Sequence, residues 1–170
     1  MNVPVLHTER LVMREVGEAD LDAVAAISAD PEVMGWLGSE PLDRDEAWRR
    51  LAYSLGHWRL RGFGHWALEH RDTGEFVGQA GLYRPEGWPG TEVGWTLARA
   101  HWGAGYATEA ARAALAWGWS ELGLTRIVSV IRPENERSTA VALRLGMTDS
   151  GERFEYRGFR HVVWELARPA

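Results

Sequence analysis

The stretch that decides the fold reads Trp102-Gly103-Ala104-Gly105-Tyr106-Ala107-Thr108-Glu109-Ala110, and it joins a strand-like run at residues 91–98 to a helical run. Gly103 and Gly105 remove side chains that would keep a ligand away from the backbone. The helix that follows directs unpaired N–H groups and the positive end of its dipole at the loop. The pattern predicts a seat for a phosphate, and the alternative is a glycine pair that serves only the turn.

The loop differs from the two common nucleotide motifs. Thr108 occupies the third glycine position of a dinucleotide fingerprint, and the chain has no Gly-Lys-Ser/Thr segment of a P-loop. The sequence therefore favours neither of these nucleotide sites.

Composition favours a single domain over residues 1–170. The chain is 45% hydrophobic, enough for a sizeable core, and no Pro-rich or Ser-rich linker divides it. The formal net charge is −5 and there is no dense basic block, which argues against nucleic acid or an anionic membrane as a partner. No apolar run approaches the roughly 20 residues of a membrane span, and residues 1–10 lack a signal-peptide core. We therefore expect a cytoplasmic protein.

The residue types also limit the chemistry. The chain has no cysteine, which excludes disulfides, thiolate metal sites and a cysteine nucleophile. Its six histidines are scattered, and none forms the i, i+4 pair of a metal-binding helix, so we expect no metal site. His65 and His101 lie near the loop and its neighbouring strands, and we interpret them as surface or strand residues. Carboxylates, hydroxyls, histidine and backbone groups remain available for catalysis.

Periodicity and turn residues predict an α+β protein. A capping-box pattern at Asp43 and Glu46 begins one of the helices, and Gly146 ends another. A short turn is expected near residues 33–37. Strands are predicted at residues 10–16, 63–69, 76–83, 91–98, 124–131, 147–156 and 158–166, and helices at 18–29, 43–61, 107–122 and 138–145. The order of elements is that of a sheet protein rather than a regular βαβ repeat.

Three segments in order resemble the GNAT superfamily of acyl-CoA-dependent N-acyltransferases. They are the strand Glu92-Val93-Gly94-Trp95-Thr96-Leu97, the glycine loop, and Asn135-Glu136-Arg137-Ser138 running into Leu145-Gly146-Met147. The loop wording and Leu6-x-Thr8-Glu9-Arg10-Leu11 resemble the RimJ/RimL-type branch in particular. The resemblance covers nearly the whole chain. It implies a GNAT-like, strongly twisted mixed β-sheet of about seven strands flanked by about four helices, with acetyl-CoA held in a split between two central strands.

The resemblance also implies which residues bind the cofactor. Backbone groups freed by the split would pair with the pantetheine arm, and an N–H near Thr96 would polarise the thioester carbonyl. Trp102 stands where many relatives have Gln or Arg, so the pyrophosphate would depend on backbone N–H groups. Asn135 would bond the pantetheine amides, or would only form a turn after Pro133. The implied cofactor-binding set is Thr96, Leu97, Ala98, Trp102, Gly103, Ala104, Gly105, Tyr106, Ala107, Thr108, Asn135 and Ser138.

Three side chains are candidates for catalysis. An amine must be neutral before it attacks, so a carboxylate is needed as general base. The resemblance makes Glu92 the first candidate for this base and Glu155 the second. For each, the alternative is an ordinary solvent-facing residue of a strand. Ser138 matches a serine placed near the sulfur in RimL-type enzymes, but it also fits the N-cap of its own helix. The tyrosine that many relatives use as the acid is replaced by Ala142.

The expected activity is acetyl transfer to a primary amine by direct attack in a ternary complex. A protein N-terminus, a lysine side chain, an aminoglycoside-like amine and a small metabolite amine all stay open as acceptors. Gln79 and Tyr83 are candidates for the acceptor pocket. Some of the ten tryptophans are candidates as well, namely Trp36, Trp58, Trp66, Trp88 and Trp95, and the alternative is that they belong to the core. The rival hypothesis is a non-catalytic acyl-CoA sensor or partner module. The sequence does not indicate an oligomeric state.

Overall fold

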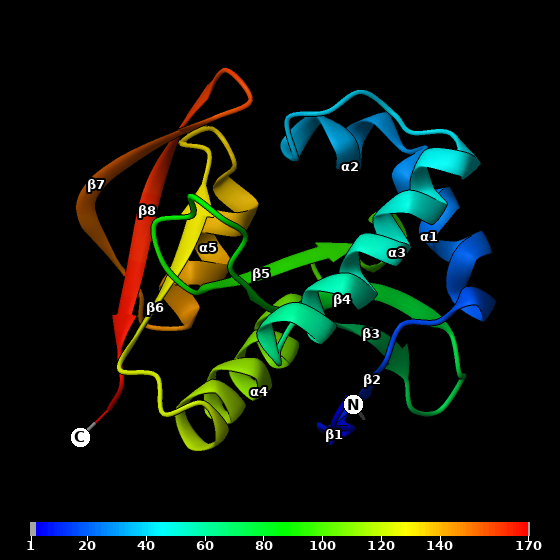
Figure 1. The fold of residues 1–170 in the computed structure, drawn as a ribbon, viewed down its shortest axis with the longest axis horizontal. Coiled ribbons are helices and arrows are strands. Elements are labelled where there is room, and N and C mark those ends of the chain that lie inside the picture. Colours follow the sequence, from blue (N-terminus) through cyan, green and yellow to red (C-terminus); the bar gives the residue numbers. More distant parts are fainter. Residues whose placement is uncertain (1–2, 170) are drawn as a thin grey trace.

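The computed structural model describes residues 3–169, and these form one eight-stranded sheet with helices on both faces (Figure 1). The strands are β1 Leu6–His7, β2 Leu11–Arg14, β3 His65–His70, β4 Phe76–Tyr83, β5 Glu92–Leu97, β6 Arg126–Ile131, β7 Thr148–Tyr156 and β8 Phe159–Ala167. Their order is β1-β2-β3-β4-β5-β6-β8-β7. The α-helices are α1 Leu21–Ser28, α2 Pro31–Trp36, α3 Arg44–Arg61, α4 Tyr106–Glu121 and α5 Glu136–Arg144. Short 3₁₀ turns, η1 Glu18–Asp20 and η2 Arg99–His101, precede α1 and the glycine loop.

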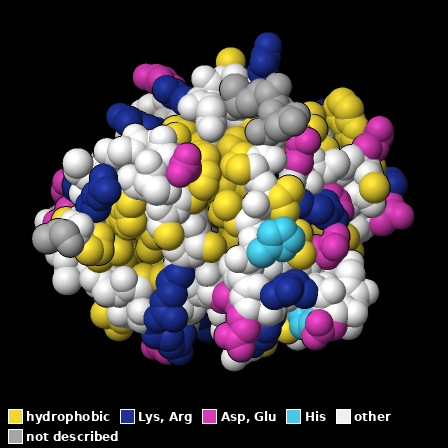
Figure 2. Space-filling model, turned by 90° about the horizontal axis from the view of Figure 1, so that it is seen from below, with side chains coloured by type: hydrophobic (Ala, Val, Ile, Leu, Met, Phe, Trp, Pro, Cys, Tyr) yellow, Lys and Arg dark blue, Asp and Glu magenta, His cyan; other side chains and the backbone are white. Residues whose placement is uncertain are grey.

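The two faces of the sheet bury different cores because side chains alternate along each strand. On β3, Trp66 and Leu68 face α4 in the main core, where the small side chains of that helix permit close packing. Ala67 faces the other way, into a smaller core beneath α1 and α3 that includes Val24 and Leu51. Seen from the α4 side, arginine and acidic side chains are interspersed with hydrophobic ones (Figure 2). No helix within residues 3–169 combines the length and apolarity that crossing a membrane requires.

The sheet forks between β5 and β6. These strands are its one parallel pair among the described residues, and their register consists of Glu92 opposite Val128. The Val128 amide donates to the Thr91 carbonyl (2.9 Å). Beyond this point the strands diverge, as Figure 1 shows, so the backbone edges that face each other there have no strand partner among the described residues.

Most predicted elements are present and their bounds shift by a few residues. The α3 capping box is confirmed, with the Glu46 amide donating to Asp43 (2.8 Å) and the Asp43 amide to Glu46 (3.1 Å). The turn expected at residues 33–37 is wrong: α2 forms there, because Pro31 suits the first helical position and Asp30 caps the Glu32 amide (2.9 Å). The short β1 makes eight strands instead of about seven. The mixed α+β architecture is otherwise as expected.

Candidate active site

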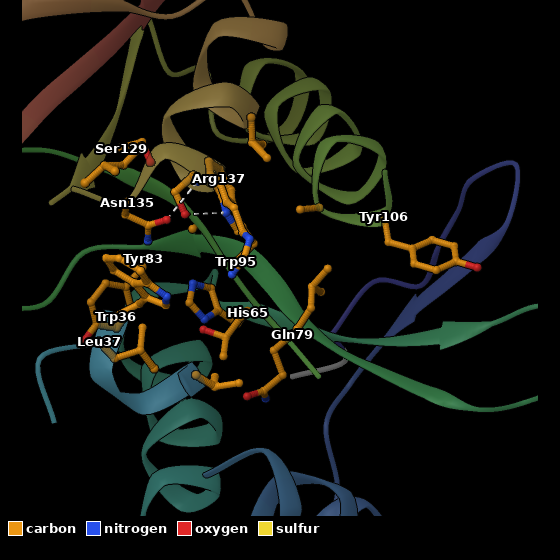
Figure 3. A pocket seen from close by; sticks show the side chains of 18 of the residues that line it. Trp36, Leu37, His65, Gln79, Tyr83, Trp95, Tyr106, Ser129, Asn135 and Arg137 are labelled. Carbon is orange, nitrogen blue, oxygen red and sulfur yellow. Dashed lines mark hydrogen bonds between the residues drawn. The ribbon is translucent and has the colours of Figure 1, made fainter. Parts of the chain in front are cut away.

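One cleft of about 1700 Å³ runs along the fork. We name its two ends after the ligands that the sequence leads us to expect there. The donor end comprises the glycine loop, the start of α4 and the turn between β1 and β2, and the acceptor end comprises α2, α3 and the tip of the β7–β8 hairpin. Figure 3 shows Trp36, Leu37, His65 and Tyr83 gathered at one end and Tyr106 at the other. Of the sequence-predicted site residues, all line this cleft except Ala98 and Glu155.

The glycine loop presents a row of free amides at the donor end. Gly103 and Gly105 have positive φ angles of 80° and 87°, a conformation that residues with a Cβ atom rarely adopt. Within the described chain, the amides of residues 103–108 have no hydrogen-bond partner, since the first bond of α4 runs from Glu109 back to Gly105. The buried Thr108 hydroxyl also lacks a partner. The loop therefore fits an oxyanion such as a phosphate.

The turn at Thr8–Arg10 holds this loop in place through Glu109. The Glu109 carboxylate accepts bonds from the Thr8 hydroxyl (2.6 Å), the Arg10 amide (2.7 Å) and Arg10 Nε (2.8 Å). Arg10 Nη1 also donates to the Ala104 carbonyl (2.9 Å). Burial alone would raise the pKa of Glu109, but these bonds outweigh it and keep that pKa below its ordinary value. These contacts fix the Thr8–Arg10 turn against the Glu109-containing loop.

Trp102 acts as a platform in place of a charged side chain. Its Nε1 donates to the Leu97 carbonyl (3.0 Å), and the Arg137 guanidinium lies 4.7 Å from the centre of its ring. Arg10, Arg112 and Arg144 line the same end of the cleft. Sequence reasoning missed these four arginines because they are spread from residue 10 to residue 144, without a local basic cluster.

The register of β5 corrects the expectation for Thr96. The Ala98 amide donates a hydrogen bond to the Val77 carbonyl on β4 (3.0 Å), whereas the Thr91 carbonyl accepts one from the Val128 amide on β6. Because backbone direction alternates along a strand, Thr96 and Ala98 direct their N–H groups at β4. The amides that point into the fork are those of Trp95 and Leu97. The predicted donor thus moves by one residue.

Glu92 lies at the origin of the fork. Its carboxylate accepts bonds from Trp88 Nε1 (2.6 Å) and from the Val130 amide (2.9 Å), which would pair with β5 in a regular parallel ladder. Burial raises the pKa of Glu92 to about 7, and the two bonds only partly oppose that rise. A Cβ atom on Gly94 would lie 3.4 Å from His65 Nε2 and 3.9 Å from Glu92 Cδ, so both side chains border the same spot.

Glu155 and Ser138 have different surroundings from those that sequence suggested. Glu155 is exposed on β7 outside the cleft, so the geometry favours Glu92 as base. The N-cap of α5 is Asn135, whose Oδ1 accepts the Ser138 amide (3.1 Å). Ser138 Oγ instead accepts a hydrogen bond from Trp95 Nε1 (3.3 Å), which leaves the hydroxyl proton of Ser138 free to donate.

The acceptor end is aromatic and contains neutral histidines. His57 and His65 both have lowered pKa values because of burial, that of His65 reaching about 3. In the part of the chain that the structure describes, His65 Nε2 and Gln79 Nε2 are buried without hydrogen-bond partners. Trp36, Trp88 and Trp95 line the cleft, whereas Trp58 and Trp66 belong to the core, so both interpretations of the tryptophans apply.

His101 lies at the donor end of the cleft, beside Glu75 (3.2 Å). Among residues 3–169, no cluster of three His, Cys, Asp or Glu side chains is placed to hold a metal.

Comparisons with known proteins agree with this geometry. Residues 10–148 match the model of the acetyltransferase (GNAT) domain. The chain belongs to the GNAT acetyltransferase family. It is 30% identical to the uncharacterized N-acetyltransferase YoaA of Bacillus subtilis over 90% of this chain and 88% of that protein.

Solved structures of other acetyltransferases are similar to this chain over nearly their whole length. An acetyltransferase from Agrobacterium tumefaciens superposes with a TM-score of 0.88 at 33% identity, covering 99% of this chain and 96% of that one. Spermidine N-acetyltransferase of Vibrio cholerae, solved with CoA and spermine, has a TM-score of 0.74 at 18% identity, with 93% and 95% covered. Because the identity to the spermidine enzyme is only 18%, that similarity shows the fold alone. The chain is thus an acetyl-transferring enzyme with the GNAT fold.

Proposed function

We propose that this acetyltransferase moves the acetyl group of acetyl-CoA to a primary amine by direct attack in a ternary complex. The observation that carries the proposal is the continuity of the cleft, which joins the free loop amides to Glu92 at the fork. A donor lying along the fork and an amine entering from the acceptor end would meet beside Gly94.

The donor end fits the parts of acetyl-CoA in order. Loop amides 103–108, with Arg10 and Arg137 nearby, would bind the pyrophosphate. The amide-bearing pantetheine arm would take the place of the missing strand and pair with β5 at Trp95 and Leu97. The unpartnered Thr108 hydroxyl supports an oxyanion at this position.

The reaction then needs three proton transfers and one acyl transfer. Glu92, as the carboxylate, takes a proton from the substrate ammonium directly or through a water molecule. The amine lone pair forms a C–N bond to the thioester carbonyl carbon while a fork-facing β5 amide stabilises the charge on the carbonyl oxygen. The C–S bond breaks as Ser138 donates its proton to the departing sulfur. Ser138 then regains a proton from the cationic nitrogen, directly or through a water molecule, which leaves a neutral amide and free CoA thiol. Ser138 would thereby supply the acid that Ala142 cannot.

We assign the enzyme to the RimJ/RimL-like branch because the turn and the glycine loop that resemble this branch are joined by hydrogen bonds. Thr8, Arg10 and Glu109 bond one another directly at the donor end. The acceptor amine belongs either to a protein N-terminus or to a small molecule, and the branch alone does not choose between them.

The activity is tested by incubating the protein with acetyl-CoA and a panel of small amines and peptides while measuring CoA release. The chain has no lysine, so acetylation of its own lysine side chains cannot contribute to the signal. Thermal-shift titration with acetyl-CoA reports binding separately. Stabilisation with CoA release that depends on an amine supports transfer. Stabilisation without release from any amine would indicate the non-catalytic binding module instead.

A further inference from the structure

The acceptor end of the cleft contains positive charge that its acidic groups leave unpaired. Of the residues that the structure describes, eight arginines but four glutamates line the cleft, although the whole chain has 24 acidic and 19 basic residues. Glu9, Glu109 and Glu136 lie around the donor end. The lining glutamate left at the acceptor end is Glu92, and its two oxygens already accept bonds from Trp88 and Val130.

Two of the acceptor-end arginines have no ion pair within the described part of the chain. Arg49 pairs with Asp45 (2.7 Å), and Arg132 lies 3.6 Å from Glu134. Arg50 on α3 instead donates to the Met34 sulfur (3.3 Å), a weak acceptor. Arg157, in the β7–β8 turn, lies 5.3 Å from the ring centre of Tyr156.

The arrangement of Arg50 and Arg157 is electrostatically unfavourable without a ligand. Burial lowers the pKa of Arg50, and the nearby charge of Arg157 lowers it further. The histidines beside them are held neutral by burial, so they neither add to this charge nor offset it. A buried cation without a counterion is costly, so a partner anion would stabilise this end of the cleft.

The backbone holds Arg157 in this position at some cost. Its φ angle is 50°, a left-handed conformation that residues other than glycine adopt rarely, because Arg157 and Gly158 (φ 77°) form the two-residue turn between β7 and β8. The hairpin tip packs on the loop after α2, where a Cβ atom on Gly38 would lie 3.1 Å from the Phe159 ring and 3.7 Å from Arg157 Cβ. Figure 1 shows this tip and α2 facing each other across the acceptor end.

We propose that the acceptor amine carries an oxyanion, in the simplest case a carboxylate, that Arg50 and Arg157 bind at the acceptor end of the cleft. This inference rests on the proposed acetyl transfer and narrows its substrate class. Guanidinium groups bind planar carboxylates with paired hydrogen bonds, and Trp36, Tyr83 and Tyr156 offer an apolar wall for the rest of the molecule. Amino acids and similar molecules fit this site, whereas a polyamine would bring further positive charge to the two arginines.

The test compares amines that differ only in the anionic group. The common amino acids are assayed with acetyl-CoA beside their decarboxylated amines, with spermidine as a cationic acceptor and with O-phosphoethanolamine against ethanolamine as a phosphate arm. For the wild-type enzyme, kcat/KM should be about ten-fold or more higher with the best anionic acceptor than with the matching amine that lacks the anionic group. Arg50→Gln should remove most of that preference by slowing the anionic acceptor alone, and Arg157→Gln should act in the same direction. Arg59→Gln, on an exposed part of the same helix, is the matched control.

Calorimetric titration of the CoA-saturated protein with the same pairs separates this inference from the proposed activity. If anionic acceptors bind through Arg50 but no CoA is released, the acetyl-transfer proposal fails and the anion site stands. If CoA is released equally from each member of a pair, or fastest with spermidine, the anion site is overturned and the activity stands. A preference for O-phosphoethanolamine over all amino acids would identify the oxyanion as a phosphate. Failure of every anionic acceptor to bind or react would also overturn the site.

Discussion

The two ends of the cleft are built in different ways. The donor end uses backbone amides of one continuous loop, fixed by a helix start and by the Thr8–Arg10 turn. The acceptor end uses side chains from α2, α3, β3, β4 and the β7–β8 turn, which lie far apart in the sequence. A backbone site depends weakly on side-chain identity, so it suits a ligand common to a family. A side-chain site changes with each substitution, so it suits the acceptor that distinguishes one member from another.

Gly105→Glu should have the largest effect, and it should act on the donor end alone. The new side chain would be strained at φ 87° and would place a negative charge among the amides that we propose to bind the pyrophosphate. We expect CoA affinity to fall by about 100-fold or more, since a close like charge costs several kcal/mol. Thermal-shift and calorimetric titration with CoA measure this.

Gly123→Glu is the matched control for that change. Gly123 also has a positive φ angle (63°), and it lies past the end of α4 with open space around it. It should show the same backbone strain with unchanged CoA affinity. Equal loss of affinity in both variants would remove the loop from the donor site.

Ser138→Ala tests the point where the two ends meet. Asn135 caps α5, so the helix should persist, while the proposed proton donor for the departing sulfur is lost. We expect kcat to fall by about 10- to 100-fold with CoA affinity nearly unchanged, in keeping with the contribution of general acids. Steady-state kinetics with Ser120→Ala, an exposed serine of α4, as control checks this. A wild-type kcat for Ser138→Ala would assign the serine to structure alone.

Arg137→Gln should give a smaller effect that is confined to binding. The guanidinium lies on the Trp102 ring at the donor end, and its loss should raise the Kd for CoA by about ten-fold at low salt. Added salt should reduce the difference because it screens the phosphate charge. The kcat at saturating acetyl-CoA should not change. A lowered kcat, or no change in Kd compared with the exposed control Arg160→Gln, contradicts this role.

The same contrast explains what could be predicted from sequence. The helix start at Tyr106, the capping box of α3 and the strand Glu92–Leu97 are set by local patterns, and each was predictable. The amides that face the fork depend on strand register, so Trp95 and Leu97 could not be distinguished from Thr96. Arg50 and Arg157 lie 107 positions apart, and only the fold brings them together. Glu92 was predicted by resemblance, but its bond to Val130 required the structure.

The central claim is that Glu92, at the origin of the fork, takes the proton from the amine. The most direct measurement is the pH dependence of kcat for wild type and Glu92→Gln, with CoA affinity measured in parallel. The raised pKa means that Glu92 becomes an active base only as pH rises through about 7, so wild-type kcat should increase through that range and then level. Glu92→Gln should retain CoA binding, lose this limb and have a kcat lower by about 10²- to 10⁴-fold. An unchanged kcat with the same pH limb would contradict the assignment.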